Sequence, residues 1–106
     1  MITLIESPLF TKLWPDYWSE DERGAFSAWL AQNPGVGDVV PGSGGVRKVR
    51  WSLEGQGKRG GVRVIYFTEF NKGCIWLLTI YAKSKKGNIP SHILKQLKEV
   101  LVDGHE

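Results

Sequence analysis

Residues 61–82 read GVRVIYFTEFNKGCIWLLTIYA, which is two β-rich runs joined by a short polar turn. Both runs, Gly61–Phe70 and Cys74–Ala82, are rich in the β-branched and aromatic residues that strands favour. The turn Asn71-Lys72-Gly73 is typical of a hairpin, because asparagine and glycine tolerate the backbone conformations of tight turns. The sequence therefore predicts an antiparallel pair of long strands as the centre of the fold.

The residues before this hairpin carry the signals of a short strand and two helices. Ile2–Ile5 is a candidate strand. Ser7 and Pro8 suit the cap and the first position of a helix that ends before the next proline. The sequence Ser19-Glu20-Asp21-Glu22 is a capping box, so we expect a second helix after it, closing near Asn33-Pro34. We assign the acidic side chains of this turn to capping rather than to catalysis.

Between the second helix and the hairpin the pattern changes from helical to alternating. Asp38–Val40 is a candidate short strand, and Val46–Ser52 is a strand with Lys48 and Arg50 on one face. After the hairpin, apolar residues at helical spacing predict a final helix: Ile93, Leu94, Leu97, Val100 and Leu101. The order β-α-α-β-β-β-β-α predicts an α+β fold and a single domain over residues 1–106. Two N-terminal helices and a C-terminal helix would pack on a central antiparallel sheet.

The composition excludes several classes of protein. With 42% hydrophobic and 24% charged residues the chain is globular rather than disordered. No run of about 18 apolar residues occurs, so we expect no membrane span. Met1–Pro8 lacks the basic region and long apolar stretch of a signal peptide, and the single cysteine, Cys74, is interpreted as a core residue. We therefore expect a cytoplasmic protein.

The net charge of +3 conceals a strong asymmetry along the chain. Residues 1–40 contain two basic and six acidic side chains, a net of −4, whereas residues 41–98 contain twelve basic and two acidic side chains, a net of +10. A polyanion-binding face carried on a neutral or acidic scaffold has this distribution. An ordinary solvated surface is the alternative, and the excess of twelve basic over two acidic side chains in residues 41–98 disfavours it.

The segment Gly57–Tyr66 places cations in a glycine-rich loop that runs into a strand. Glycine lets a backbone approach a ligand closely because it has no Cβ. Lys58 and Arg59 supply charge on this loop, and Arg63 holds its guanidinium fork on a stiff strand, where it can bind phosphate. The combination predicts a phosphate-handling site, with RNA as the polyanion that we favour.

Other kinds of site have little support. His92 and His105 have no histidine or cysteine partner at metal-ligand spacing, so we expect no metal and no cofactor. Gly42–Gly45 lacks the strand-to-helix context and the Lys-Ser/Thr of a phosphate-binding loop, and we interpret it as a turn.

What remains is a cluster of cationic and phenolic side chains that the predicted strands bring near one another: Lys48, Arg50, Arg63, Tyr81 and Lys83. Such a cluster can stabilise the extra negative charge on a scissile phosphate. A lysine or tyrosine in its field can have a lowered pKa and move a proton, which allows RNA cleavage through the substrate's own 2′-OH. Alternatively, the same residues only bind phosphates.

Three segments resemble the RelE/HigB-type toxins of bacterial type II toxin-antitoxin systems, specifically the HigB-like branch: Gly44–Arg50, Gly57–Tyr66 and Leu77–Lys83. The likeness extends from the first strand to the last helix, and the order of elements agrees. It implies a RelE-like fold and a ribosome-dependent endoribonuclease, an mRNA interferase, that cuts mRNA in the ribosomal A site and inhibits translation. It also implies a cognate antitoxin, often a helix-turn-helix protein, which neutralises the toxin; operator DNA would be bound only through the complex.

The resemblance also implies roles within the cluster. Lys48 and Arg50 would orient or activate the 2′-OH, Arg63 would bind the phosphate, and Lys83 would close the site and assist the leaving 5′-oxygen. The family often has a tyrosine a few residues after that last basic residue, and Lys85–Ser91 contains none. Tyr81 is then either its substitute or a packed residue of the sheet.

Cations outside the catalytic set are expected to contact RNA, because binding the phosphate backbone is the usual role of loop cations. They are Arg47, Lys58, Arg59, Lys85 and Lys86. Two alternatives to the toxin interpretation stay open: a basic RNA-binding module without catalysis, and a protein-interaction domain that uses exposed tryptophans.

Overall fold

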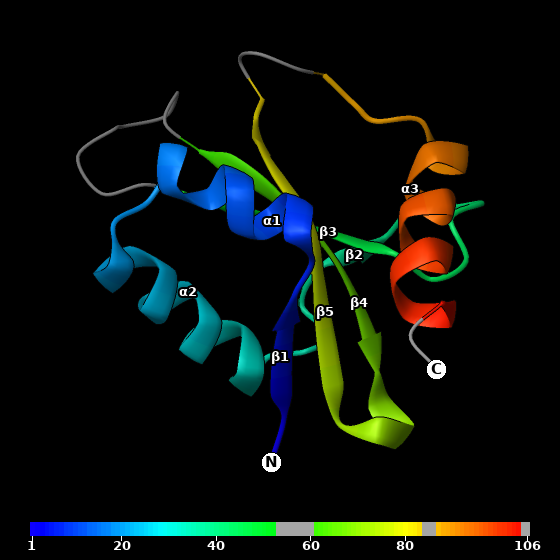
Figure 1. Cartoon of the computed structure of the whole chain (residues 1–106), viewed down its shortest axis with the longest axis horizontal. Coiled ribbons are helices and arrows are strands. Elements are labelled where there is room, and N and C mark those ends of the chain that lie inside the picture. The colour runs from blue at the N-terminus through cyan, green and yellow to red at the C-terminus, as the bar shows by residue number, and fades with distance from the viewer. Residues whose placement is uncertain (53–60, 84–86, 105–106) are drawn as a thin grey trace.

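The computed structural model describes residues 1–52, 61–83 and 87–104 (Figure 1). Within these ranges the chain forms five strands: β1 (Thr3–Glu6), β2 (Asp38–Val39), β3 (Arg47–Trp51), β4 (Val62–Glu69) and β5 (Cys74–Ala82). The α-helices of the same ranges are α1 (Pro8–Leu13), α2 (Glu20–Gln32) and α3 (Ser91–Lys98), and α3 continues into a π-helical turn, Glu99–Asp103. The predicted α+β class is confirmed, and none of the helices in the described residues is long and apolar enough to cross a membrane.

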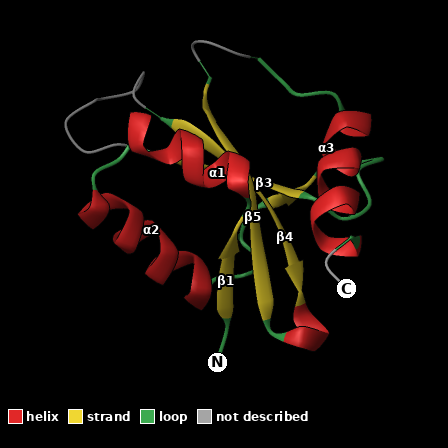
Figure 2. Ribbon diagram, viewed as in Figure 1, coloured by secondary structure: helices red, strands yellow, loops and turns green. Residues whose placement is uncertain are grey.

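The strands form one sheet in the order β1-β5-β4-β3-β2, with the predicted hairpin at its centre (Figure 2). The pairs β2–β3, β3–β4 and β4–β5 are antiparallel, as expected. The pair β1–β5 is parallel, so the sheet is mixed rather than wholly antiparallel. A parallel pair needs a long connection between its strands, and the chain between β1 and β5 contains both N-terminal helices.

Both predicted helix starts are confirmed by their caps. Ser7 Oγ accepts a hydrogen bond from Phe10 N–H at 2.9 Å, with Pro8 at the first helical position. Ser19 Oγ accepts from Glu22 N–H at 3.2 Å, and the Glu22 carboxylate accepts from Ser19 N–H at 2.8 Å. These side chains satisfy N–H groups that a helix leaves without internal partners.

The sheet separates two apolar cores. One face packs against α1 and α2 through residues such as Phe10, Phe26 and Leu30, which are fully buried. The other face packs against α3 through Leu94, and the π-helical turn adds Val102. The strands β4 and β5 contribute residues from opposite faces to the two cores, and the face on which a strand residue lies decides the side of each cation.

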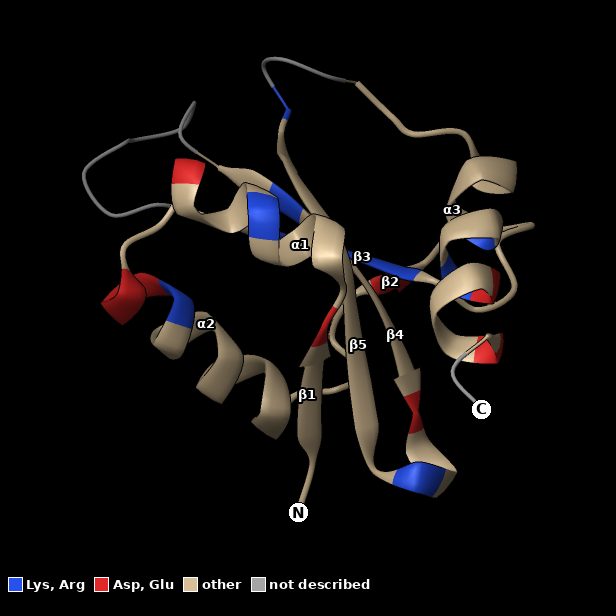
Figure 3. Cartoon of the chain, in the orientation of Figure 1, with Lys and Arg blue, Asp and Glu red and all other residues tan. Residues whose placement is uncertain are grey.

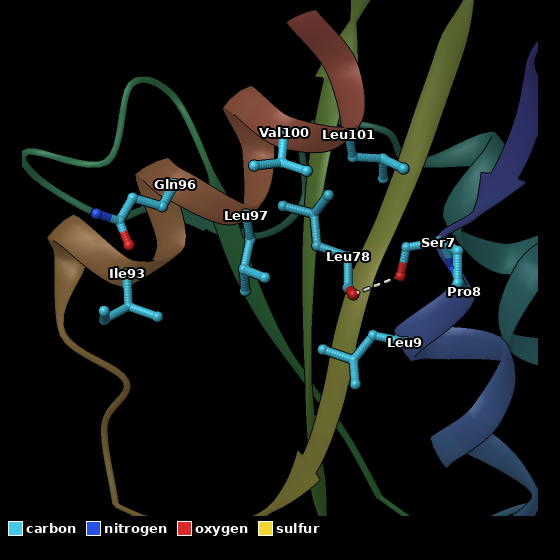
Figure 4. Close-up of a pocket in the computed structure, with 9 residues that line it drawn as sticks. All are labelled: Ser7, Pro8, Leu9, Leu78, Ile93, Gln96, Leu97, Val100 and Leu101. Carbon is cyan, nitrogen blue, oxygen red and sulfur yellow. Dashed lines mark hydrogen bonds between the residues drawn. The ribbon is translucent and has the colours of Figure 1, made fainter. Parts of the chain in front are cut away.

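A groove of about 440 Å³ lies between α1 and α3 (Figure 4). Leu9 forms part of one wall, and Ile93 and Val100 form part of the other. Ser7 Oγ donates to Leu78 O at 2.7 Å and so ties the start of α1 to β5. Ile93 and Val100 were predicted on the apolar stripe of the last helix; both line this groove, and Val100 is 79% exposed.

Candidate phosphate-binding site

Strand pairing brings three of the predicted site residues into one row across the sheet. Arg50 of β3 is the partner of Arg63 of β4, and Arg63 is the partner of Tyr81 of β5. Residues directly opposite one another on neighbouring strands share a face of the sheet. The row lies at the end of the sheet where β3 and β5 finish and β4 begins.

Lys48 lies two residues before Arg50 in β3, next to this row. It lies on the same face as Arg50, as the alternation predicted, and its strand partner is Ile65. Ile65 belongs to the core that contains Leu94, so this is the face that carries α3. Lys48 Nζ donates a hydrogen bond to Asn88 Oδ1 at 3.2 Å. The structure thus gathers three cations at one end of one face.

Carboxylates do not neutralise these cations within the described residues. Arg23 pairs with Glu6 at 2.9 Å and with Glu20 at 2.8 Å, remote in sequence from the row. Figure 3 shows the acidic residues of α2 gathered at its start, whereas β3 and the start of β4 carry basic residues. In residues 1–52, 61–83 and 87–104, no carboxylate forms an ion pair with Lys48, Arg50 or Arg63. Unpaired positive charge of this kind favours anion binding.

Tyr81 ends the row and is only 7% exposed. Burial raises its pKa, and the nearby charge of Arg63 opposes part of that rise. The expectation of a phenol with a lowered pKa is therefore wrong for Tyr81, because desolvation of the phenolate outweighs the attraction of the arginine. The hydroxyl keeps its proton at neutral pH and can donate a hydrogen bond to an anion.

An apolar pocket of about 410 Å³ runs beside Tyr81. Tyr17 and Leu13 from the N-terminal helical region and Ile89 and Ile93 from the C-terminal region contribute to its lining. Tyr81 therefore packs in the sheet and also borders the cationic row, so both roles that the sequence left open are compatible with its position.

Arg47 lies on the opposite face from the row, because it neighbours Lys48 in the strand and pairs with Tyr66 of the other core. Its Nη1 donates to Gly37 O at 2.8 Å and to Gly35 O at 3.1 Å. These bonds hold the segment that precedes β2. The structure does not bring Arg47 together with the other site cations, and its contact with RNA stays a prediction.

Lys83 follows directly after β5 and its side chain is exposed. It lies two residues beyond Tyr81, at the same end of the sheet as the row. Four predicted RNA-contacting residues lie outside the described residues: Lys58, Arg59, Lys85 and Lys86.

The other residues that the sequence drew attention to lie elsewhere. His92 is exposed near the start of α3, His105 lies outside the described residues, and Cys74 is half-buried beside the second core. Gly42, with φ of 77°, lies in a turn, as predicted. In the part of the chain that the structure describes, no three His, Cys, Asp or Glu residues group so that they could hold a metal ion.

Asn88 is a site residue that the sequence analysis missed. Its contact with Lys48 spans 40 positions in the sequence. An asparagine in a polar connector forms part of no periodic pattern, so only the folded chain reveals it.

Comparison with known proteins supports the fold. No family model matches the chain. Among solved structures, the chain is similar to a double mutant of the E. coli toxin RelE in its free state, with a TM-score of 0.59 and 14% sequence identity. The match covers 80% of this chain and 86% of that chain. At this identity the likeness concerns the fold, and the chain therefore has the RelE-like fold that its sequence motifs implied.

Proposed function

We propose that this protein is the toxin of a type II toxin-antitoxin system, a ribosome-dependent endoribonuclease of the HigB-like branch. It cleaves mRNA in the ribosomal A site and so inhibits translation. The observation that carries the proposal is the row of Arg50, Arg63 and Tyr81 with Lys48 beside it. The RelE-like fold and the net charge of +10 over residues 41–98 also support it.

The proposed reaction is metal-independent attack of the substrate's 2′-oxygen on the adjacent phosphorus. The O2′–P bond forms as the proton of the 2′-OH passes to solvent water, and the P–O5′ bond breaks as the 5′-oxygen takes a proton from Lys83. The products are a 2′,3′-cyclic phosphate and a free 5′-hydroxyl end. Negative charge on the phosphoryl oxygens grows in the transition state, and fixed cations stabilise it. Arg63 binds this phosphate because it lies in the middle of the row, between Arg50 and Tyr81.

The neighbouring residues are assigned to the two oxygens that react. Lys48 and Arg50, side by side on one face of β3, orient and activate the 2′-OH. Lys83, at the end of β5, assists the leaving 5′-oxygen as a proton donor. Because its pKa is raised, Tyr81 donates a hydrogen bond to the phosphate rather than accepting the proton of the 2′-OH.

The proposal includes partners and a location. A cognate antitoxin, of the helix-turn-helix type, neutralises the toxin, and operator DNA is bound only through that complex. The target is mRNA on the ribosome, so the protein acts in the cytoplasm. Positive charge beyond the catalytic row, from Arg47, Lys58, Arg59, Lys85 and Lys86, binds RNA.

Primer extension on a translated mRNA, with and without ribosomes, tests the proposal. Wild-type protein should cut within the A-site codon only when ribosomes are present. Arg63→Ala should lower kcat by about 10²–10³, the usual cost of removing one transition-state donor. Lys72→Ala is the matched control, because Lys72 is an exposed cation at the hairpin, at the other end of β4 and β5 from the row.

Two outcomes would replace the proposal with its alternatives. Intact message together with tight, salt-sensitive RNA binding would indicate an RNA-binding module without catalysis. The absence of any RNA affinity would indicate a protein-interaction domain.

A further inference from the structure

The segment that directly precedes α3 contacts a cation beside the row. Between β5 and α3 the structure describes Lys83 and Gly87–Pro90, and Lys48 Nζ donates a hydrogen bond to Asn88 Oδ1 at 3.2 Å. Lys48 belongs to β3, whereas Asn88 follows β5. The contact therefore joins β3 to the segment that directly precedes α3.

The two residues that follow Asn88 in the chain are anchored by their own contacts. Ile89 packs against the core of this face and lines the pocket beside Tyr81. Pro90 O accepts hydrogen bonds from Ile93 N–H at 3.0 Å and from Leu94 N–H at 3.2 Å, which fixes the start of α3. The amide of Asn88 thus extends from an anchored segment rather than from a free loop.

An amide suits the task of holding an ammonium group in a phosphate site. A lysine side chain has four flexible carbons, and its ammonium carries three donors. One donor goes to the Asn88 carbonyl oxygen, and two stay available for the oxygens of a substrate. Because the amide is neutral, it directs the ammonium without cancelling its charge, as a carboxylate would.

We infer that Asn88 is a positioning residue of this site, whose side-chain amide holds the ammonium of Lys48 in the orientation that RNA cleavage requires. The inference rests on the proposed function for its catalytic meaning. The contact itself belongs to the free protein and can be tested without activity.

A double-mutant cycle on the ribosome tests the catalytic part. Asn88→Ala should lower kcat about tenfold and change KM by less than about twofold, since only orientation is lost. In a Lys48→Ala background the same change should have almost no further effect, because Asn88 acts through Lys48. Asn71→Ala, at an exposed asparagine of the hairpin, is the control and should resemble the wild type. Equal losses from Asn88→Ala in both backgrounds would overturn the inference.

Relaxation measurements on the ¹⁵N-labelled lysine ammonium groups test the contact in the free protein. The order parameter of the Lys48 ammonium should fall in Asn88→Ala and stay unchanged in Asn71→Ala. An unchanged order parameter in Asn88→Ala would refute the positioning role. A wild-type protein that leaves mRNA intact would refute the proposed function instead, so the two failures are distinguishable.

Discussion

Replacing Arg63 by glutamine should stabilise the free protein while removing its activity. Arg50 and Arg63 are direct partners across β3 and β4, and neither forms an ion pair with a carboxylate of the described residues. Unit charges about 5–7 Å apart in water repel by about 0.6–0.8 kcal/mol. Like charges directly opposite in a sheet cost a similar amount, about 0.2–1 kcal/mol. Glutamine keeps most of the aliphatic stem, so little packing is lost.

Urea denaturation followed by tryptophan fluorescence measures the free energy of unfolding. At low ionic strength Arg63→Gln should gain about 0.6–0.8 kcal/mol, which corresponds to roughly 2–5 °C in Tm. The gain should largely vanish at about 1 M salt, where the Debye length falls to about 3 Å. The same variant should lose about 10²–10³ in kcat for mRNA cleavage on the ribosome.

Arg23→Gln provides the matched control. Arg23 pairs with Glu6 at 2.9 Å and with Glu20 at 2.8 Å, so its neutralisation should lower the free energy of unfolding rather than raise it. If Arg63→Gln also lowers the stability at low salt, Arg63 has a favourable partner in the free protein. The conclusion that Arg50 and Arg63 repel each other in the free protein would then be wrong.

Three further predictions concern the parts of the fold that support the site. Tyr66→Phe should lower the free energy of unfolding by about 1–3 kcal/mol in urea, because it leaves Gly37 N–H, which donates to the Tyr66 hydroxyl at 2.7 Å, buried and unpaired; an unchanged midpoint would contradict this. Ser7→Ala should cost about 1–2 kcal/mol in a thermal melt, since it removes the α1 cap and the bond to Leu78 O, and a Tm equal to wild type would exclude that role. Burial raises the pKa of Tyr81, so its neutral form stabilises the fold below pH about 10 and this contribution is lost at higher pH. The urea midpoint should therefore decrease less between pH about 8 and pH about 10.5 in Tyr81→Phe than in wild type. An equal decrease in both proteins would argue against the burial effect.

The elements that could be predicted from the sequence are those set by local chemistry. Ser7 with Pro8, and the capping box at Ser19, locate two helix starts through contacts within four residues. The hairpin between β4 and β5 is also local, since four residues join its strands. Alternation along β3 placed Lys48 and Arg50 on one face correctly.

The features that escaped prediction depend on contacts between distant segments. The direction of β1 beside β5 is decided by how both helices pack, and no periodicity in Thr3–Glu6 reports it. Asn88 meets Lys48 only in the folded chain, where the segment before α3 lies beside β3. The position of Arg47, by contrast, could be predicted from the sequence. The alternation that places Lys48 on one face of β3 also places the neighbouring Arg47 on the opposite face.

The pair Arg50 and Arg63 is unfavourable for folding but suited to phosphate binding. Both cores are complete without Arg50 and Arg63, because apolar residues from alternate strand positions form them. Folding alone therefore gives no reason for two like charges to face each other across β3 and β4, where they reduce stability. Binding of a phosphate between them reverses the sign of their contribution, since each cation then faces an anion. RNA should accordingly stabilise the wild type more than Arg63→Gln, and this difference should shrink with salt as the repulsion does.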